Sequence, residues 1–278
     1  IRDIGVTGVQ TCALPISLGR VFRSTPAVAL TENETEYVVN CTKHIFLNHI
    51  VLQFQVNNTI PEQQLVDVKV DLEGSNDELF IPSKSIEASE VKYEDPAFCY
   101  TIIERNLEET LSSESFRCNL LFRVVEVDPS TGEVDGDPTG FEEEYQLEDL
   151  HIEVSDFMSK ISLGNFRVSW DGLGEENEVK ERFQLPQKTL EEGVSAIIKL
   201  LGMQPCDGTQ QIKQNQSAGK DGKLTHDLRL SGVFVGNKQV LVWCKYVLSE
   251  GGNQMIFTIK VRSPEQALSQ LVADCIQG

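Results

Sequence analysis

The segment 163–174 holds the residues that best fit a recognition site. Trp170 is one of only two tryptophans in the chain, and serine, glycine, aspartate and glutamate surround it. Phe166 comes four residues earlier, so a helix would place both rings on one face. A large aromatic side chain is usually buried, and composition alone therefore favours a core tryptophan. A partly exposed tryptophan would instead anchor a bound peptide, because the indole offers a large apolar surface.

Residue types that serve catalysis or metal binding are present, but their spacing suits neither. The sequence contains no GxSxG, HExxH or phosphate-loop motif, and its four histidines are dispersed. Cys41, His44 and His49 suit a metal by type, but strand geometry turns successive members to opposite faces, so we interpret them as structural. Residues 132–144 lack the spacing of a calcium loop and are interpreted as a solvated loop. We predict no metal and no cofactor, and we keep a cytosolic enzyme with an unrecognised active site as the alternative function.

Acidic residues are concentrated in one half of the chain. The whole chain carries a net charge of −19. Residues 18–150 contain 9 basic and 27 acidic side chains, a net of −18, whereas residues 151–278 contain 14 and 15, a net of −1. An acidic first half argues against nucleic acid or anionic lipid as its partner, and the second half is where an acidic partner could dock. Seven cysteines without a CxxC pair indicate reduced thiols in a cytosolic protein.

The first seventeen residues, IRDIGVTGVQTCALPIS, differ in character from the rest of the chain. They lack the basic start and the long apolar run of a signal peptide. Codons for residues 1–3 and 6–16 can be chosen so that together they spell a sequencing-library primer. We therefore interpret residues 1–17 as a translated adapter and not as natural sequence. A natural transcript that reads through these codons without a break would contradict this interpretation.

The first half of the chain shows the pattern of an all-β domain. Residues 18–35 are polar and aperiodic, which is typical of the end of a linker. Within residues 36–150, short alternating segments predict strands at 37–42, 49–56, 65–72, 98–103 and 115–127. In segment 65–72 the even-numbered residues are expected to share the buried face. Many short strands at regular spacing predict an immunoglobulin-like β-sandwich. Glycosylation triplets keep an extracellular adhesion module as a further alternative, and they begin at Asn33, Asn40 and Asn57.

The second half, residues 151–278, predicts an α+β domain in which helices pack on an antiparallel sheet. A helix is predicted over 189–203, with a capping box at its first residues and a glycine at its end. A second helix is predicted to start with a cap at Ser263 and a capping box. The polar segment 210–223 is interpreted as a loop. Strands are predicted at 179–185, 228–235, 239–248 and 254–262, the last three joined by hairpin turns.

Six stretches of this chain resemble one known family. From about Val21 onward the chain is similar to the appendage (ear) domain of the coatomer gamma subunit, a component of the COPI vesicle coat. The stretches follow one another in the same order and read TENETEYVV from residue 31, CTKH from 41, YQLEDL from 145, KTLEE from 188, LGMQPC from 201 and LSGVF from 230. The resemblance implies a β-sandwich subdomain over 36–150, a platform subdomain over 151–278, and a missing trunk.

The resemblance also implies a function and a site. It implies a non-enzymatic interaction module that recruits an ArfGAP-type regulatory protein through the platform, in Golgi-to-ER and intra-Golgi transport. Other coatomer subunits would bind through the trunk, nucleic acid would not bind, and contact with the Golgi membrane would be indirect, on its cytosolic side. The family's binding tryptophan falls on Trp170 and a basic site residue on Arg262. A family arginine falls on Trp243, with Lys245 as a partial replacement, and Phe166 completes the expected site. On this interpretation Trp170→Ser would abolish partner capture without lowering the melting temperature.

Overall fold

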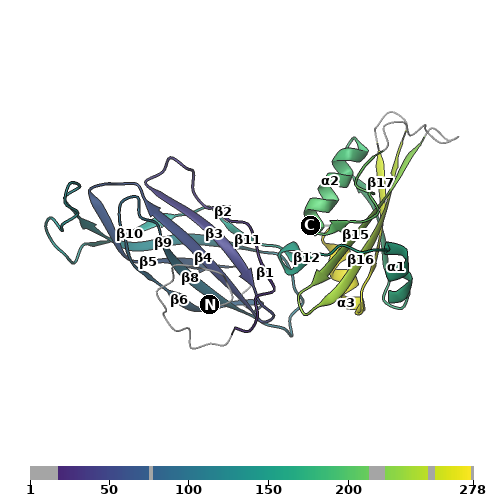
Figure 1. Ribbon diagram of the computed structural model, residues 1–278, viewed down its shortest axis with the longest axis horizontal. Coiled ribbons are helices and arrows are strands. Elements are labelled where there is room, and N and C mark those ends of the chain that lie inside the picture. Colours follow the sequence, from purple (N-terminus) through teal and green to yellow (C-terminus); the bar gives the residue numbers. More distant parts are fainter. Residues whose placement is uncertain (1–17, 75–77, 213–222, 250–253, 277–278) are drawn as a thin grey trace. The chain divides into compact units, whose positions relative to one another are not determined.

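The computed structural model describes residues 18–74, 78–212, 223–249 and 254–276 (Figure 1). The chain separates into two compact units, Ile1–Glu153 and Val154–Gly278. Three interpretations made from the sequence lie wholly or mostly outside the described residues. They concern the adapter-like segment 1–17, the polar loop 210–223 and the hairpin turn at 251–253.

The first unit is a sandwich of two antiparallel sheets. The first sheet has the strand order β1-β3-β4-β8-β6, and β2 also pairs with β3. The second sheet has the order β10-β9-β5-β7, and β11 also pairs with β9. The bounds of the first-sheet strands are β1 Arg23–Ser24, β2 Val28–Ala29, β3 Tyr37–Ile45, β4 His49–Asn58, β6 Phe80–Ile86 and β8 Ala97–Arg105. The bounds of the second-sheet strands are β5 Gln63–Glu73, β7 Ala88–Val91, β9 Glu114–Glu126, β10 Phe141–Gln146 and β11 Leu150–Ile152.

Alternating apolar residues from both sheets form the core of this sandwich, as the sequence pattern predicts. Phe54 on β4 and Leu120 on β9 are fully buried. Tyr37 packs edge-on against Phe122, with ring centroids 4.8 Å apart, and against Tyr145 at 5.4 Å. The immunoglobulin-like sandwich expected over the first half is therefore confirmed as a fold class.

The ends of this unit differ from the sequence-based expectation. Residues 18–35 are not a linker, because β1 and β2 pair with β3 and the Leu30 side chain is only 1% exposed. The segment 132–144 is predicted to be a solvated loop; residues 141–144 are exposed, but they belong to β10, which pairs with β9 from Phe141 onward. β11 carries the sheet past residue 150 to Ile152. Pairing with a neighbouring strand of the same sheet orders these segments, although their polar composition does not indicate it.

A β-bulge changes which residues of β5 face the core. The pairing with β9 shifts register between Val66 and Lys69, and Asp67 adopts a left-handed backbone with φ of 54°. Leu65 and Val68 are consequently both buried, whereas Val66 is half-exposed. Strict alternation, which predicted Val66 inside, is therefore wrong before the bulge and correct after it.

Two buried thiols and one buried phenol are expected to make the first unit less stable at alkaline pH. Burial raises the pKa of the Cys99 and Cys118 thiols from 9.0 to about 12. Burial, with the nearby charges of Glu36 and Glu143, raises the pKa of Tyr37 from 10.0 to about 12. The folded state favours the protonated form of each group. The contribution of each group to the free energy of unfolding is therefore complete below its unfolded pKa and is lost as the pH rises toward 12.

We therefore expect the urea midpoint of the first unit to fall progressively from pH 9 upward. Circular dichroism would follow the whole chain, and tryptophan fluorescence would report the second unit alone, because both tryptophans lie there. In a Cys99→Ala/Cys118→Ala variant the fall should begin about one pH unit later, since only Tyr37 remains of the three. An unchanged onset in that variant would contradict the assignment to the thiols.

The second unit is a twisted antiparallel sheet with helices on both faces. The strand order of this third sheet is β12-β15-β16-β17-β13, and β14 also pairs with β15. The strands are β12 Met158–Lys160, β13 Val179–Leu185, β14 Gln204–Pro205, β15 Leu224–Phe234, β16 Lys238–Leu248 and β17 Met255–Arg262. The helices are the 3-10 helix η1 Val154–Phe157, and α1 Phe166–Leu173, α2 Leu190–Leu201 and α3 Gln266–Asp274. The predicted α+β class is confirmed.

The two faces of the third sheet carry different helices. Figure 1 shows α1 and α2 on opposite sides of this sheet. α2 lies so close to the inner face that a Cβ on Gly193 would meet the Met255 sulfur at 2.8 Å. α3 adjoins the same inner face through Gln270, whose amide donates to Glu181 of β13 at 2.8 Å. The face under α1 is called the outer face below.

The predicted caps are present in α2 but not in α3. The Thr189 hydroxyl accepts from the Glu192 backbone N–H, the reciprocal bond is present, and Gly202 is left-handed, so the capping box and glycine stop of α2 are confirmed. α3 begins later than predicted, with Glu265 as its N-cap and no side-chain cap. Ser263 is instead buried and bonds to Glu265 and Ser269, which is why it does not start the helix.

Candidate partner-binding site

The helix that carries Trp170, α1, is short and strongly amphipathic. The Asn165 side chain caps its start by accepting from the Val168 backbone N–H at 3.1 Å. Phe166 and Trp170 point to the sheet and are buried, whereas Val168 is 68% exposed. The four-residue spacing therefore places both rings on one helical face, as the sequence predicts.

An aromatic cluster fixes α1 to the outer face of the third sheet. The Phe166 and Trp170 rings stack with centroids 5.6 Å apart, and Trp243 of β16 meets Trp170 edge-on at 5.6 Å. Leu241 and Cys206 complete the buried cluster. Trp170 is only 3% exposed, so the expectation of a partly exposed anchor is wrong. The indole is covered because α1 lies flat on the sheet, and Trp243 is the more accessible of the two rings.

Arg262 is also buried, at 4% exposure, and its guanidinium is held on several sides. Its carbon lies 4.4 Å from the centre of the Trp170 ring, a cation–π contact. Nη1 donates to the Trp170 carbonyl at 3.0 Å, and Nε donates to the Glu178 carboxylate at 2.7 Å. Nη2 lies 2.7 Å from the same carboxylate and 3.0 Å from that of Glu175. Arg262 therefore binds the protein's own groups and is not the free cation that the sequence suggests.

Glu178 is the main counter-ion of this arrangement. Lys260 lies 2.8 Å from its carboxylate, which Arg262 also contacts. Burial opposes ionisation of Glu178, but the hydrogen bonds and charges of Lys260 and Arg262 outweigh it and hold the pKa of this carboxyl below its ordinary value. The carboxylate consequently stays ionised and ties β17 to the segment that follows α1.

Strand pairing places further cations beside the aromatic cluster. Trp243 pairs with Lys260, which pairs with Lys180, so these three residues form a row across the outer face. One step further along the strands, Lys245 and Arg182 lie in the next row, on either side of Thr258. Lys180, Arg182 and Lys245 are exposed. Within the described ranges, none of these three side chains has an ion-pair partner.

These residues border one groove on the outer face, named here the basic groove. It has a volume of about 720 Å³. Its lining contains six basic and four acidic side chains, a net of +2, in a chain whose total is −19. The partly exposed floor adds apolar surface from Trp243, Val247 and Ile256. The basic lining residues are Arg167, Lys180, Arg182, Lys245, Lys260 and Arg262, and the acidic ones are Asp171, Glu175, Glu181 and Asp227.

The structure brings together all five residues singled out from the sequence. Trp170, Trp243, Lys245 and Arg262 line the basic groove, and Phe166 lies under the two indoles. Sequence analysis missed Lys180 and Arg182. Their two-residue spacing in a predicted strand places them on one face, but the sequence does not show that β13 pairs with β17.

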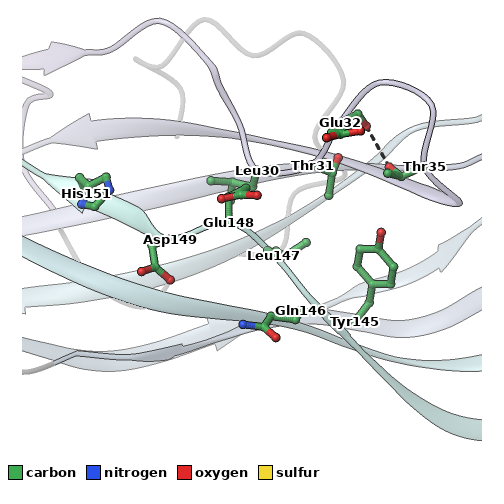
Figure 2. A pocket seen from close by; sticks show the side chains of 10 residues that line it. All are labelled: Leu30, Thr31, Glu32, Thr35, Tyr145, Gln146, Leu147, Glu148, Asp149 and His151. Atoms are coloured by element: carbon green, nitrogen blue, oxygen red, sulfur yellow. Dashed lines mark hydrogen bonds between the residues drawn. The ribbon is translucent and has the colours of Figure 1, made fainter.

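The first unit has a hollow of its own, of about 600 Å³, shown in Figure 2. The loop between β2 and β3 and the segment from the end of β10 into β11 form its walls. The Glu32 carbonyl accepts from the Thr35 hydroxyl at 2.9 Å, drawn as a dashed line. Glu32, Glu148 and Asp149 make the hollow acidic. No group of His, Cys, Asp or Glu among the described residues could hold a metal ion, and this hollow is no exception.

The candidate metal residues of the sequence have other partners. His44 contacts the Ser24 hydroxyl through Nδ1 at 2.7 Å and the Gln53 side-chain oxygen through Nε2 at 2.9 Å. Cys41 is fully buried three positions away along the same strand. Both groups therefore help to hold the first sheet together.

Two family models match the two units in turn. The model described as "Coatomer gamma subunit appendage platform subdomain" matches residues 10–153, and "Coatomer subunit gamma-1 C-terminal appendage platform" matches residues 155–276. The chain belongs to the coatomer gamma subunit family. The matched regions make it a coatomer gamma appendage domain, and appendage domains of this family are interaction modules of a coat and not enzymes. The first match begins at residue 10, inside the segment interpreted as an adapter.

Individual relatives of this coatomer gamma appendage agree with the family models. Coatomer subunit gamma-2 of Oryza sativa subsp. japonica is 41% identical over 261 residues, which is 93% of this chain and 28% of the relative. Coatomer subunit gamma-1 of Homo sapiens is 39% identical over 275 residues, 96% of this chain and 29% of the relative. The appendage chain thus spans less than a third of the length of these relatives. No helix among its described residues is long and apolar enough to cross a bilayer.

Proposed function

We propose that this appendage is an interaction module of the COPI vesicle coat, and that its basic groove recruits an ArfGAP-type regulatory protein. The groove would bind a short acidic motif that also carries an aromatic residue. Recruitment of this kind would serve Golgi-to-ER and intra-Golgi transport, on the cytosolic side of the Golgi membrane. Other coatomer subunits would be bound by parts of the subunit outside this chain.

The observation that carries the proposal is a group of basic side chains without ion pairs, beside the partly exposed indole of Trp243. Lys180, Arg182 and Lys245 are exposed and form no ion pair within the described ranges, although Asp227 lies opposite Lys245 in the strand register, and the groove as a whole has a net charge of +2 in a chain whose total is −19. Trp243 and the neighbouring aliphatic side chains offer apolar surface for an aromatic side chain. Complementary charge of this kind selects a partner and speeds its association.

The proposal predicts that Arg182→Glu/Lys245→Glu weakens binding of an acidic aromatic peptide by about tenfold or more. Isothermal titration with a synthetic peptide, in which aspartates flank a central phenylalanine, would measure the affinity. The effect should shrink at high ionic strength, because salt screens exposed charges. Capture of an ArfGAP from cytosol, detected by immunoblot, should fall in the same variant.

A charge-matched control separates the groove from the overall charge. Lys188→Glu/Lys199→Glu makes the same change in net charge with two exposed lysines outside the groove. This control should bind the peptide with little loss. Equal binding by both double variants would contradict a site in the basic groove.

A further inference from the structure

Glu175 combines an exposed position with a contact to a buried cation. Its side chain is 85% exposed, yet its Oε1 lies 3.0 Å from Nη2 of Arg262, whose side chain is only 5% exposed. Both residues line the basic groove. Glu175 belongs to the short segment between α1 and β13, where a backbone bond from Glu178 N–H to its carbonyl makes a turn.

The other partners of Arg262 are fixed parts of the fold. Glu178 is 14% exposed and also binds Lys260, so its carboxylate is held from two sides. The Trp170 carbonyl belongs to the backbone of α1, which the aromatic cluster holds on the sheet. Among the described groups, the carboxylate of Glu175 is thus the one acceptor on this guanidinium that can leave without disturbing the core.

We infer that Glu175 occupies, in the free protein, the position on Arg262 that a carboxylate of an acidic partner takes on binding. This inference rests on the proposed function of the basic groove. It resolves why a buried arginine lines a recognition groove: its Nη2 is covered by an internal ligand of the same chemistry as the expected partner. Binding then exchanges one carboxylate for another and leaves the number of hydrogen bonds to Arg262 unchanged.

This exchange has an electrostatic consequence. An incoming carboxylate meets the negative charge of Glu175 at the same guanidinium, and two carboxylates at one site repel each other. Glu175 therefore weakens binding of acidic partners until it swings away into solvent, where its exposed side chain is readily hydrated. Glu175→Gln removes the repulsion and keeps the shape of the side chain.

The test compares Glu175→Gln with Glu176→Gln. Glu176 is the next residue, is exposed, and has no hydrogen bond or ion pair within the part of the chain that the structure describes. Both variants change the net charge equally, so their difference isolates the contact with Arg262. The probe is the synthetic peptide with aspartates around a central phenylalanine, titrated at low and at high ionic strength.

We expect Glu175→Gln to bind the peptide about threefold or more tightly than Glu176→Gln at low ionic strength, and the difference to shrink at high ionic strength. Equal affinities, or weaker binding by Glu175→Gln, would overturn the exchange. If Arg182→Glu/Lys245→Glu still abolishes binding in that case, the proposed function survives without it. If neither the unaltered chain nor Glu175→Gln binds the peptide, both proposals fail.

Discussion

Replacing Trp170 with alanine is expected to destabilise the second unit by about 3–5 kcal/mol, the usual result of removing a large buried aromatic side chain. For a unit of this size the melting temperature should fall by roughly 10 to 20 °C. Trp170 is 3% exposed, stacks on Phe166, meets Trp243 edge-on and lies under the Arg262 guanidinium. Its loss opens a cavity where α1 is attached to the sheet.

Calorimetry of the whole chain would measure the effect, and the transition of the first unit should not move. Val168→Ala is the matched control, because Val168 lies on the same helix and is 68% exposed. That control should change the melting temperature little. A Trp170→Ala protein that melts normally but no longer captures its partner would restore the exposed-anchor interpretation made from the sequence.

Removing the buried cation should have an effect of similar size. Arg262→Met is expected to cost about 3–5 kcal/mol, because breaking a buried ion pair leaves the remaining buried charge with too little compensation. Glu178 would keep only Lys260, and the Trp170 carbonyl would lose its donor. Exposed pairs give the scale for comparison: Arg167→Met, which breaks the surface pair with Asp171, should cost at most about 1 kcal/mol.

The pH dependence identifies the cause of the Arg262→Met effect. In the unaltered protein the pKa of Glu178 lies below its ordinary value of 4.5, so its ionised form stabilises the fold above that pH. This stabilisation is lost as the pH falls through the folded pKa. The difference between the unaltered protein and Arg262→Met should therefore be largest near neutral pH and shrink in acid. A difference in urea midpoint that stays constant from neutral to acid pH would assign the cost to lost packing instead.

Local patterns were sufficient to predict much of the fold. The strand over 179–185 and the capped helix α2 follow from period and capping residues within a few positions of one another. The same approach failed where the deciding partner is distant in sequence. Leu30 is buried because β2 pairs with β3, and the shifted phase of β5 depends on its register with β9.

In the site, too, local sequence predicts some features, and partners distant in sequence determine the others. The spacing of Phe166 and Trp170 gave their shared face, but the burial of Trp170 depends on the sheet surface under α1. Arg262 follows Trp170 by ninety-two positions in sequence, and Glu178 reaches it from a loop that no local pattern marks. Whether an aromatic or a cation is exposed is a property of the packed unit, and residue type alone does not determine it.

Five of the six basic residues of the groove lie on strands, so the strand geometry fixes the distances between them. Along a strand, residues on one face repeat about every 6.8 Å, and neighbouring strands lie about 4.8 Å apart. An extended ligand that lies parallel to β13 repeats its own side chains at the same interval, so every second residue meets the same kind of position. The groove would therefore select a ligand by the order of its residues as well as by its composition. A scrambled peptide of equal charge would fit less well.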